Sequence, residues 1–266
     1  MSLCQRPTTT LGTNGYGCHK TRSTPAWPPH SLPRLFVNEA LSEGAQVMVD
    51  GNYLAAVLRL GPGDRVKLFD DRTGEWLAEI VEAGKKRVTL RIGERLRQRE
   101  DVPDLWLVFA PVKRGRIDWL VEKATELGVA RLQPVITRRT IVDRLNLERL
   151  RAHAVEAAEQ CERTALPLLD EPRKLDALLK GWPADRILWF ADEAGGAPFA
   201  PDPGPAAILI GPEGGFTDEE RAAIRAHPQA RPVSLGPRIL RADTAALAAV
   251  ALWMGAAGDW SRHGDR

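Results

Sequence analysis

An apolar stretch, a glycine-rich loop and a helix-start signal follow one another between residues 206 and 220. The five residues 206–210 are all apolar, which is typical of a strand buried on both faces of a parallel sheet. Thr217, with Glu220 three positions later, is the pattern of a capping box, which begins a helix. Strand, tight loop and helix in succession form the repeating unit of α/β folds, so this segment predicts a mainly parallel sheet covered by helices.

Three glycines give the loop between this strand and this helix the properties of a ligand site. Gly211, Gly214 and Gly215 permit positive φ and let main-chain N–H groups approach a ligand closely. The loop follows the carboxyl end of a strand, where open α/β sheets bind ligands. Neither G-x-G-x-x-G nor G-x-x-x-x-G-K-S/T occurs in it, so a dinucleotide or a nucleoside triphosphate is disfavoured. An ordinary strand-to-helix turn remains the alternative interpretation.

A second loop, residues 234–245, again ends a strand with a Gly-Pro turn. Arg238 and Arg241 flank the apolar pair Ile239 and Leu240. Apolar side chains suit the face of an adenine, and arginines suit a phosphate or a developing negative charge. The alternative is that the arginines are solvated and that the apolar pair belongs to the core.

The pattern of the remaining chain predicts two domains. Residues 34–100 have five short strand-type runs separated by turn signals, at 34–37, 46–49, 65–69, 75–81 and 88–92. Only residues 53–60 have a helical pattern there, so we expect a small β-barrel-like domain. A linker at 100–103 leads to residues 104–262, where strand and helix patterns alternate as in an α/β domain with a mainly parallel sheet.

Two helices of this second domain, at 117–127 and 147–161, carry apolar residues at the i, i+3, i+4, i+7 spacing. The second of them places Cys161 on the buried stripe, where we expect a structural thiol. Further strands are predicted at 105–112, 186–191, 206–210 and 232–235.

The last helix, from about Ala242 to Trp253 or beyond, is apolar on nearly every side. Asp243 or Thr244 is expected to cap it. An apolar helix must be covered on more than one side, and either a partner subunit or the core of its own domain would provide that cover. Both interpretations remain open at this point.

Composition excludes several classes of protein. Hydrophobic residues make up 44% and charged residues 27% of the 266, which is ordinary for globular proteins and predicts neither global disorder nor a membrane protein. The longest stretch without polar side chains, 245–257, is shorter than a bilayer requires. The three cysteines and five histidines have no metal-ligand spacing, so we expect no metal site, and so few cysteines suit the reducing cytoplasm.

The net charge of +2 is too small to indicate a nucleic-acid partner by itself, but one segment is locally basic. Residues 85–99 contain seven basic side chains against the single acid Glu94. Such an excess is sufficient for a track that follows RNA phosphates, with a solvated basic strand as the alternative. Lys113, Arg114 and Arg116 could extend it, as could Arg138 and Arg139.

Residues 1–33 are rich in proline and threonine and contain no acid, so we interpret them as a disordered extension. The composition also suits a transit peptide, but no amphipathic repeat is present. We expect translation to begin near Leu32, at a non-AUG codon.

Four motifs and an opening segment then resemble a known family. Its motifs are close to I-G-P-E-G-G-F and L-G-x-R-I-L-R-x-E-T-A, which are matched at 210–216 and 235–245. The further matches are at 123–129, 156–163 and 33–37. Together they resemble the ribosomal small-subunit methyltransferase E family, within the SPOUT class of S-adenosylmethionine-dependent RNA methyltransferases. The departure is Asp243, where the family often has Glu, and the carboxylate is kept.

The resemblance implies a fold, a reaction and partners. The expected fold is a SPOUT-type α/β domain with a trefoil knot, preceded by a PUA-like RNA-binding β-barrel. The expected reaction is methylation of N3 of a uridine in 16S rRNA, on the 30S ribosomal subunit, by a cytoplasmic homodimer. Without the resemblance the sequence settles neither the target nucleotide nor the methylated atom. Naked rRNA and an assembled subunit both remain possible substrates.

The resemblance also implies site residues, with the pocket formed by the loops at 190–192, 211–215 and 235–240. S-adenosylmethionine is expected to contact Phe190, Ala191, Gly211, Pro212, Glu213, Gly214, Gly215, Leu235, Gly236, Ile239, Leu240 and Thr244. Glu213 or Asp243 could take the N3 proton, and Arg241 or Arg163 could stabilise the resulting anion. With the basic segment, the expected RNA contacts are Arg34, Lys85, Lys86, Arg87, Arg91, Arg95, Arg97, Arg114, Arg138, Arg139, Gln160 and Arg163.

Two other functions compete with this one. A non-catalytic RNA-binding factor for ribosome assembly could use the same scaffold, although the intact G-P-E-G-G and R-I-L-R segments argue against it. An α/β enzyme acting on a small nucleotide, such as an oxidoreductase, is disfavoured by the missing dinucleotide motif.

Overall fold

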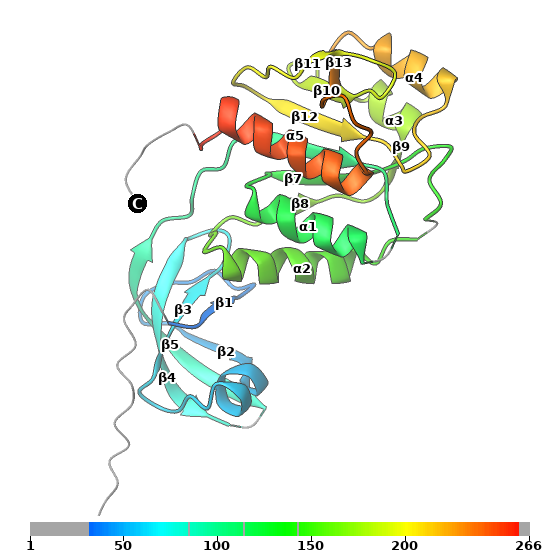
Figure 1. Ribbon diagram of the computed structural model, residues 1–266. Coiled ribbons are helices and arrows are strands. Elements are labelled where there is room, and N and C mark those ends of the chain that lie inside the picture. Colours follow the sequence, from blue (N-terminus) through cyan, green and yellow to red (C-terminus); the bar gives the residue numbers. More distant parts are fainter. Residues whose placement is uncertain (1–31, 85, 114, 143, 261–266) are drawn as a thin grey trace, which may run out of the picture. The chain divides into compact units, whose positions relative to one another are not determined.

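A computed structural model describes residues 32–260 except for 85, 114 and 143 (Figure 1). The predicted extension therefore lies outside the described residues apart from Leu32 and Pro33, and so do the predicted RNA contacts Lys85 and Arg114. The described residues belong to one compact unit. Within it the described chain builds two separate sheets.

The first sheet is a curled β half-barrel (Figure 1). It contains β1 (Arg34–Phe36), β2 (Gln46–Asp50), β3 (Arg65–Phe69), β4 (Glu75–Ala83) and β5 (Arg87–Arg97), in the order β1-β3-β4-β5-β2. All neighbours are antiparallel except β1 and β3. Alternate apolar side chains of these strands, such as Val88, Leu90 and Ile92, fill a core of their own. The helical pattern expected at 53–60 is a single wide turn, η2 (Asn52–Val57).

The second sheet is parallel throughout and has helices on both faces. Its strands are β6 (Leu105–Phe109), β7 (Arg131–Ile136), β8 (Leu168–Leu169), β9 (Arg173–Lys174), β10 (Ile187–Ala191), β11 (Ala197–Pro198), β12 (Ala206–Ile210) and β13 (Ala230–Ser234). They lie in the order β11-β13-β10-β12-β6-β7-β8, and β9 pairs with β7. The helices are α1 (Arg116–Glu126), α2 (Leu147–Gln160), α3 (Leu175–Lys180), α4 (Asp218–Arg225) and α5 (Ala242–Ala256).

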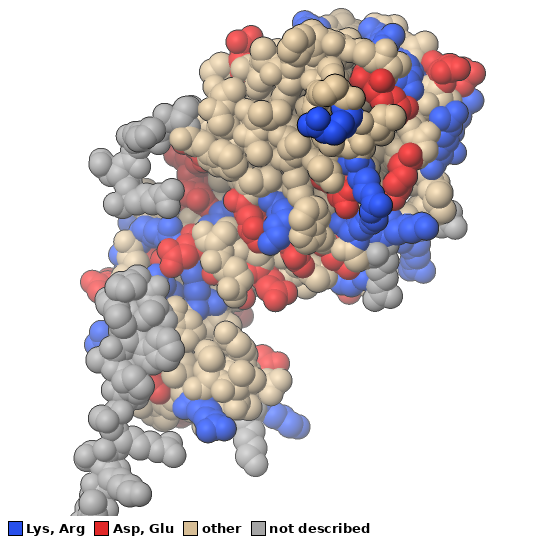
Figure 2. Space-filling model, in the orientation of Figure 1, with Lys and Arg blue, Asp and Glu red and all other residues tan. Residues whose placement is uncertain are grey.

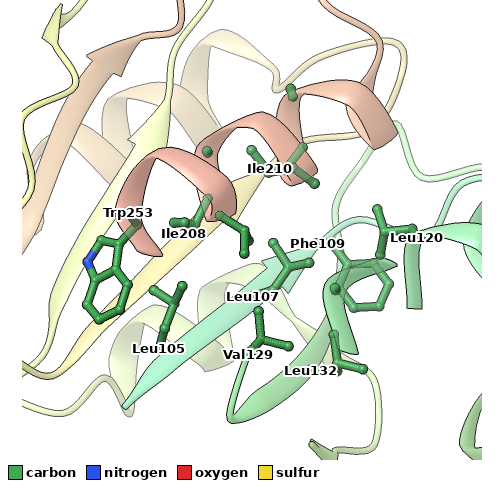
Figure 3. Packing of buried hydrophobic residues seen from close by; sticks show 14 of the residues in the cluster. Leu105, Leu107, Phe109, Leu120, Val129, Leu132, Ile208, Ile210 and Trp253 are labelled. Carbon is green, nitrogen blue, oxygen red and sulfur yellow. The ribbon is translucent and has the colours of Figure 1, made fainter. Parts of the chain in front are cut away.

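The central strand β12 shows why this sheet is covered on both sides. Ile208 and Ile210 point into the same apolar cluster as Leu107 and the α5 residue Trp253 (Figure 3). Leu209, between them, belongs to the cluster on the opposite face, with α3 and α4. Every residue of β12 is buried, as its uniformly apolar sequence predicts. The predicted small β-barrel-like domain is confirmed in the form of a half-barrel, and the predicted parallel α/β sheet is confirmed. The trefoil knot stays a prediction.

The start of α4 agrees with the sequence prediction, whereas the start of α5 and the end of α2 differ from it. The capping box of Thr217 and Glu220 begins α4, as predicted. The predicted cap of α5 is wrong, because Arg241 is the N-cap residue and Asp243 lies inside the first turn. Cys161 was expected to be buried but is exposed, because α2 ends at Gln160 and the chain turns away at Glu162, whose φ is 60°.

A buried ion pair makes the fold sensitive to acid. The Glu75 carboxylate accepts hydrogen bonds from Arg34 and Arg97, and its side chain is 4% exposed. Burial alone would raise the pKa of Glu75, but these hydrogen bonds outweigh it and hold this pKa below its ordinary value of 4.5. Because the folded pKa lies below the unfolded one, the stabilisation is present above about pH 4.5 and is lost as the pH falls through the folded pKa.

Replacing Glu75 with glutamine is therefore expected to lower the free energy of unfolding at pH 7 by about 3–5 kcal/mol, since Arg34 stays buried without its counter-charge. The difference from the wild type should shrink below about pH 4.5. Urea unfolding followed by circular dichroism at pH 7 and pH 4 measures both quantities. Glu82→Gln, an exposed position on the same strand, serves as the control. Equal acid sensitivity of the Glu75→Gln variant and the wild type would contradict this account.

Candidate functional site

Three neighbouring strands of the second sheet end at one edge and place their loops around a single pocket. Because β13, β10 and β12 are adjacent and parallel, the loops at 192–196, 211–215 and 235–241 all leave the same edge. The pocket among them encloses about 340 Å³. This volume is in the range of small-molecule sites. The strand-end argument made from the sequence is thus confirmed for the position of these loops.

Most of the residues expected to contact a cofactor line this pocket. They are Phe190, Ala191, Gly211, Pro212, Glu213, Gly215, Leu235, Gly236, Ile239 and Leu240. Gly214 and Thr244 are not among the lining residues. Gly214 instead contacts Arg139, and Thr244 lies in the first turn of α5.

The glycine-rich loop is shaped by contacts that a larger residue would disturb. A Cβ atom at Gly211 would lie 2.7 Å from the ring of Phe216, which is buried against Phe190 with ring centroids 5.3 Å apart. Gly215 has a φ of +68°, and a Cβ there would lie 2.5 Å from Oε1 of Glu193. Glycine at these two positions therefore lets the loop turn and lets Glu193 approach the main chain.

The loop after β13 supplies an apolar wall with two free cations. Ile239 is 88% exposed, and Leu235 and Leu240 are half-buried beside it in the pocket lining. Arg238 and Arg241 also line the pocket, and both are exposed. Within the described part of the chain, neither arginine forms an ion pair with another side chain. This wall can take a flat apolar group and an anion at once.

The three residues predicted to be catalytic do not all reach the pocket. Glu213 and Arg241 line it, and Glu213 is exposed. Asp243 is half-buried in the first turn of α5, is not part of the lining, and has Arg116 4.0 Å away. The pocket therefore brings together one carboxylate and one guanidinium of the predicted set.

Two charged residues of the pocket, Glu193 and Arg221, were missed in the sequence analysis. Arg221 on α4 forms ion pairs with Asp192 and, at 3.2 Å, with Glu193. Burial alone would lower the pKa of Arg221, but the pairing with Glu193 and Asp192 more than offsets this and raises it. Asp192 has no exposed side-chain surface and is also paired with Arg225. An acid pair directly after an apolar strand was the signal for Glu193, whereas Arg221 gave none.

The basic residues expected to contact RNA fall into two groups. Lys86, Arg87, Arg91 and Arg95 are exposed on β5 or just before it, and Gln160 is exposed at the end of α2. Arg97 is engaged with Glu75 and with the carbonyl of Glu162. Near the pocket, Arg138 faces Glu219 on α4, and Arg139 donates to the carbonyl of Gly214 at 2.7 Å. Lys and Arg side chains are spread over several areas of the face shown in Figure 2.

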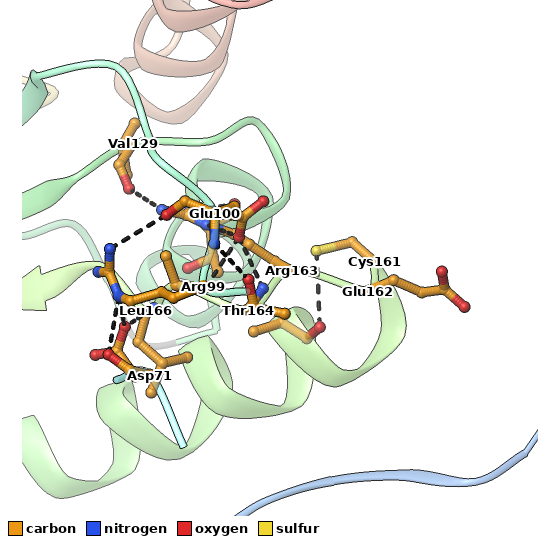
Figure 4. Close-up of polar contacts among 12 residues, drawn as sticks. Asp71, Arg99, Glu100, Val129, Cys161, Glu162, Arg163, Thr164 and Leu166 are labelled. Atoms are coloured by element: carbon orange, nitrogen blue, oxygen red, sulfur yellow. Dashed lines mark hydrogen bonds and ion pairs between the residues drawn. The ribbon is translucent and has the colours of Figure 1, made fainter. Parts of the chain in front are cut away.

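Arg34 and Arg163 do not fit the predicted contact with RNA. Arg34 is 8% exposed and donates to the carbonyls of Ala158 and Arg163. Arg163 is 5% exposed and donates to the carbonyls of Thr125 and Val129 at 2.7 and 2.8 Å (Figure 4). Because these donors are used inside the protein, we correct both assignments. The suggestion that Arg163 stabilises an anion in the pocket is corrected for the same reason.

Two features are absent from the described residues. No group of three or more His, Cys, Asp or Glu side chains is arranged to hold a metal ion in the described chain. None of its helices is long and apolar enough to cross a membrane.

Comparison with known proteins identifies the family. Residues 98–254 match the model of an RNA methyltransferase domain, and residues 50–93 match that of an RNA methyltransferase PUA domain. A ribosomal RNA small subunit methyltransferase E from Rickettsia conorii is 31% identical over 229 residues, which cover 82% of this chain and 93% of the relative. The chain belongs to the ribosomal RNA small subunit methyltransferase E family. A relative of the same name from Synechocystis is 33% identical over 211 residues, or 75% of this chain and 69% of the relative.

Two solved structures of methyltransferases agree with the fold. The methyltransferase E from Neisseria gonorrhoeae, bound to S-adenosylmethionine, superimposes with a TM-score of 0.79 at 28% identity, covering 86% of this chain and 99% of the other. A putative methyltransferase from Legionella pneumophila, in complex with the same cofactor, gives a TM-score of 0.79 at 31% identity with the same coverage.

Proposed function

We propose that this methyltransferase E family member transfers a methyl group from S-adenosylmethionine to N3 of a uridine in the 16S rRNA of the small ribosomal subunit. The observation that carries the proposal is the pocket at the carboxyl edge of β13, β10 and β12. The chain belongs to the methyltransferase E family, as the relative from Rickettsia conorii does. The family member from Neisseria gonorrhoeae is bound to S-adenosylmethionine in its solved structure. The uridine and its N3 atom come from the family resemblance, and both are open to test.

The residues of the pocket fit S-adenosylmethionine. Leu235, Ile239 and Leu240 offer an apolar surface for adenine, and Gly211 and Gly215 leave the space that Cβ atoms would fill. When bound, the cofactor supplies an electrophilic methyl group on a positively charged sulfur. The carboxylates of Glu193 and Glu213, which line the same pocket, suit a cation.

We propose that two side chains prepare uracil as a nucleophile. Neutral uracil carries a proton on N3, so that proton must leave and the negative charge on the flanking oxygens must be stabilised. We assign proton removal to the Glu213 carboxylate, because it lines the pocket and Asp243 does not. We assign the stabilisation of the anion to the Arg241 guanidinium, which is free of other charged partners in the described chain. Holding the extruded base against the methyl group supplies a further part of the rate.

The exposed cations of the half-barrel are proposed to contact RNA. Among the predicted contacts on or just before β5, Lys86, Arg87, Arg91 and Arg95 are exposed, whereas Arg97 is engaged with Glu75. If all four contact phosphates of single-stranded RNA, the logarithm of the binding constant should fall with the logarithm of salt concentration with a slope of roughly −3.

We further propose that the protein is a homodimer that uses the exposed side of α5. Asp243 is its only charged residue, and Leu252 is 52% exposed. Trp119 on α1, which packs against α5, is 44% exposed. The surface over α5 is largely free of charged side chains in Figure 2. A second copy would bury this apolar surface.

Light scattering during size-exclusion chromatography tests the dimer. Leu252→Glu should convert a dimeric wild type to a monomer, because a charge would be buried at the interface. Leu168→Glu, at an exposed position on β8, should leave the dimer intact. A monomeric wild type, or a Leu252→Glu variant that stays dimeric, would refute this interface.

Gly215→Ala is expected to weaken the binding of S-adenosylmethionine about tenfold, since a left-handed backbone costs an alanine about 1–2 kcal/mol and the new Cβ would displace Glu193. Gly63→Ala is the matched control, because Gly63 has a φ of +87° with open space around it in the half-barrel. Isothermal titration calorimetry measures both affinities. Equal affinities for the two variants would show that the loop geometry is unimportant for binding.

Transfer of labelled methyl groups tests the function. Small subunits from cells that lack this enzyme are incubated with the protein and labelled S-adenosylmethionine, and their RNA is then isolated and counted. The proposal predicts label in 16S rRNA, and none in the RNA of large subunits that are incubated separately in the same way. Binding of the cofactor without label in RNA would favour the non-catalytic assembly factor instead.

A further inference from the structure

Residues 158–166 span the last turn of α2 and the chain after it, and this docking segment is hydrogen-bonded to the half-barrel. Nη1 and Nη2 of Arg34, on β1, donate to the carbonyls of Ala158 and Arg163, each at 2.6 Å. Oδ1 of Asp71 accepts from the main-chain N–H of Leu166 at 2.9 Å. These bonds join the first sheet to the chain that leads from α2 into β8.

The linker between the two sheets is fastened to the same segment. Oε1 of Glu100 accepts from the main-chain N–H groups of Thr164 and Ala165 at 2.7 and 2.9 Å. The N–H of Glu100 donates to the hydroxyl of Thr164 at 2.9 Å. Three bonds from one linker residue leave this part of the linker little freedom to rotate.

Apolar packing accompanies the polar contacts. Phe36 and Phe69 of the half-barrel pack with Ala158 and Leu166 of the docking segment. The Arg34 guanidinium also lies over the Phe69 ring, 3.8 Å from its centroid. The half-barrel is thus held by both hydrogen bonds and buried apolar surface.

Arg163 carries the connection onward to α1, the helix that packs against α5. Its guanidinium donates to the carbonyls of Thr125 and Val129, at the end of α1, while its Nε lies 3.7 Å from Oε1 of Glu100 (Figure 4). Helix α1 packs against α5, and the α5 residues Ala242 and Ala245 line the pocket. A continuous set of contacts therefore runs from the half-barrel through Arg163 to the pocket wall.

Burying a guanidinium costs desolvation free energy, so stability by itself does not explain why Arg163 is buried. Burial lowers the pKa of Arg163, which reflects the cost of holding the charge away from water. Well-packed apolar residues often stabilise such a site as well as an ion pair does, whereas directed hydrogen bonds fix a geometry. Nη1 and Nη2 of Arg163 donate hydrogen bonds to carbonyls at and just after the end of α1. The Nε atom of Arg163 faces the Glu100 carboxylate.

We propose that Arg163, together with Glu100, is a positioning residue that fixes the half-barrel relative to the cofactor pocket, so that RNA held on β5 presents its acceptor base to the pocket. The proposal rests on the proposed function. Arg163 touches neither RNA nor cofactor, and it acts through the docking segment and α1. A displaced half-barrel would still bind RNA and would deliver the base to the wrong place.

Substitution at Arg163 and Glu100, with kinetics on small subunits, tests the proposal. Arg163→Met keeps the length and the apolar stem, Arg163→Lys restores the charge, and Glu100→Gln keeps an acceptor oxygen. Arg151→Met, an exposed site on α2, is the matched control. We expect Arg163→Met and Glu100→Gln to lower kcat/KM for small subunits about 10- to 100-fold, since small misplacements of reacting groups cost that much. The dissociation constant of S-adenosylmethionine should change by less than about twofold, as for a remote substitution, and Arg163→Lys should recover part of kcat/KM.

Two results would overturn the proposal. One is an unchanged kcat/KM for small subunits in both the Arg163→Met and Glu100→Gln variants. The other is a loss of S-adenosylmethionine affinity in parallel with kcat/KM, which would indicate general damage to the fold. Glu100→Gln keeps the test decisive if Arg163→Met does not fold.

Hydrogen exchange separates this proposal from the proposed function. If the wild type transfers no methyl group, the proposed function fails, and the exchange of the amides at 164–166 still reports on the docking. Arg163→Met should accelerate exchange there and leave the loop at 211–215 unchanged. Unchanged exchange at 164–166 would contradict the positioning role.

Discussion

Replacing Arg241 with alanine is expected to lower kcat for methyl transfer about 10²- to 10³-fold, which is the usual effect of removing one donor that stabilises a developing anion. The side chain lines the pocket and has no competing ion pair in the described chain, so its charge is available to the uracil oxygens. Single-turnover kinetics with saturating S-adenosylmethionine and small subunits measure the chemical step directly.

The control for this variant is Arg231→Ala, an exposed arginine on β13 outside the pocket lining. It should retain wild-type turnover. Binding of S-adenosylmethionine to Arg241→Ala should stay close to wild type, because the role assigned to Arg241 begins only when negative charge develops. A large loss of cofactor affinity with little loss of kcat would move Arg241 from the chemistry to cofactor binding.

A large effect on stability is expected at Trp253 on α5. Its side chain is 1% exposed and packs in the cluster with Leu105 and Ile208 (Figure 3). Trp253→Ala should lower the free energy of unfolding by about 3–5 kcal/mol, because a cavity remains where the indole was. Urea unfolding monitored by circular dichroism measures the change.

Phenylalanine at the same position provides the control. The buried Nε1 of Trp253 has no hydrogen-bond partner among the described residues, so Trp253→Phe removes a polar atom that gains nothing from burial. We expect this variant to recover most of the lost stability. A Trp253→Phe variant as unstable as Trp253→Ala would mean that an interaction of the indole N–H, and not packing, holds α5 in place.

Local chemistry was enough to predict the elements that surround the pocket. The strand β12, the glycine-rich loop and the capping box of α4 form from residues close together in the sequence, so their patterns predict them. The three loops meet because parallel neighbours end at one edge, which is a property of the fold class. The strand β7 was missed, because Gln133 and Pro134 interrupt the apolar pattern in the middle of a sheet.

Other features depend on contacts between distant residues. Arg34 and Arg163 look in the sequence like any other exposed arginine, yet carbonyl groups from other elements enclose both. The position of Cys161 depended on the residue at which α2 ends, and a helix end is determined partly by the chain that follows. The prediction of the α5 cap was wrong for a similar reason, because Arg241 takes the N-cap position and no side chain caps the helix there.

The central claim is tested most directly by identifying the nucleoside that the enzyme produces. Small subunits lacking the modification are treated with the wild type or with Arg241→Ala, and their 16S rRNA is digested and analysed by mass spectrometry against a 3-methyluridine standard. The account predicts 3-methyluridine after wild-type treatment and a strongly reduced amount with Arg241→Ala. A different methylated nucleoside, or none although cofactor binds, would contradict it.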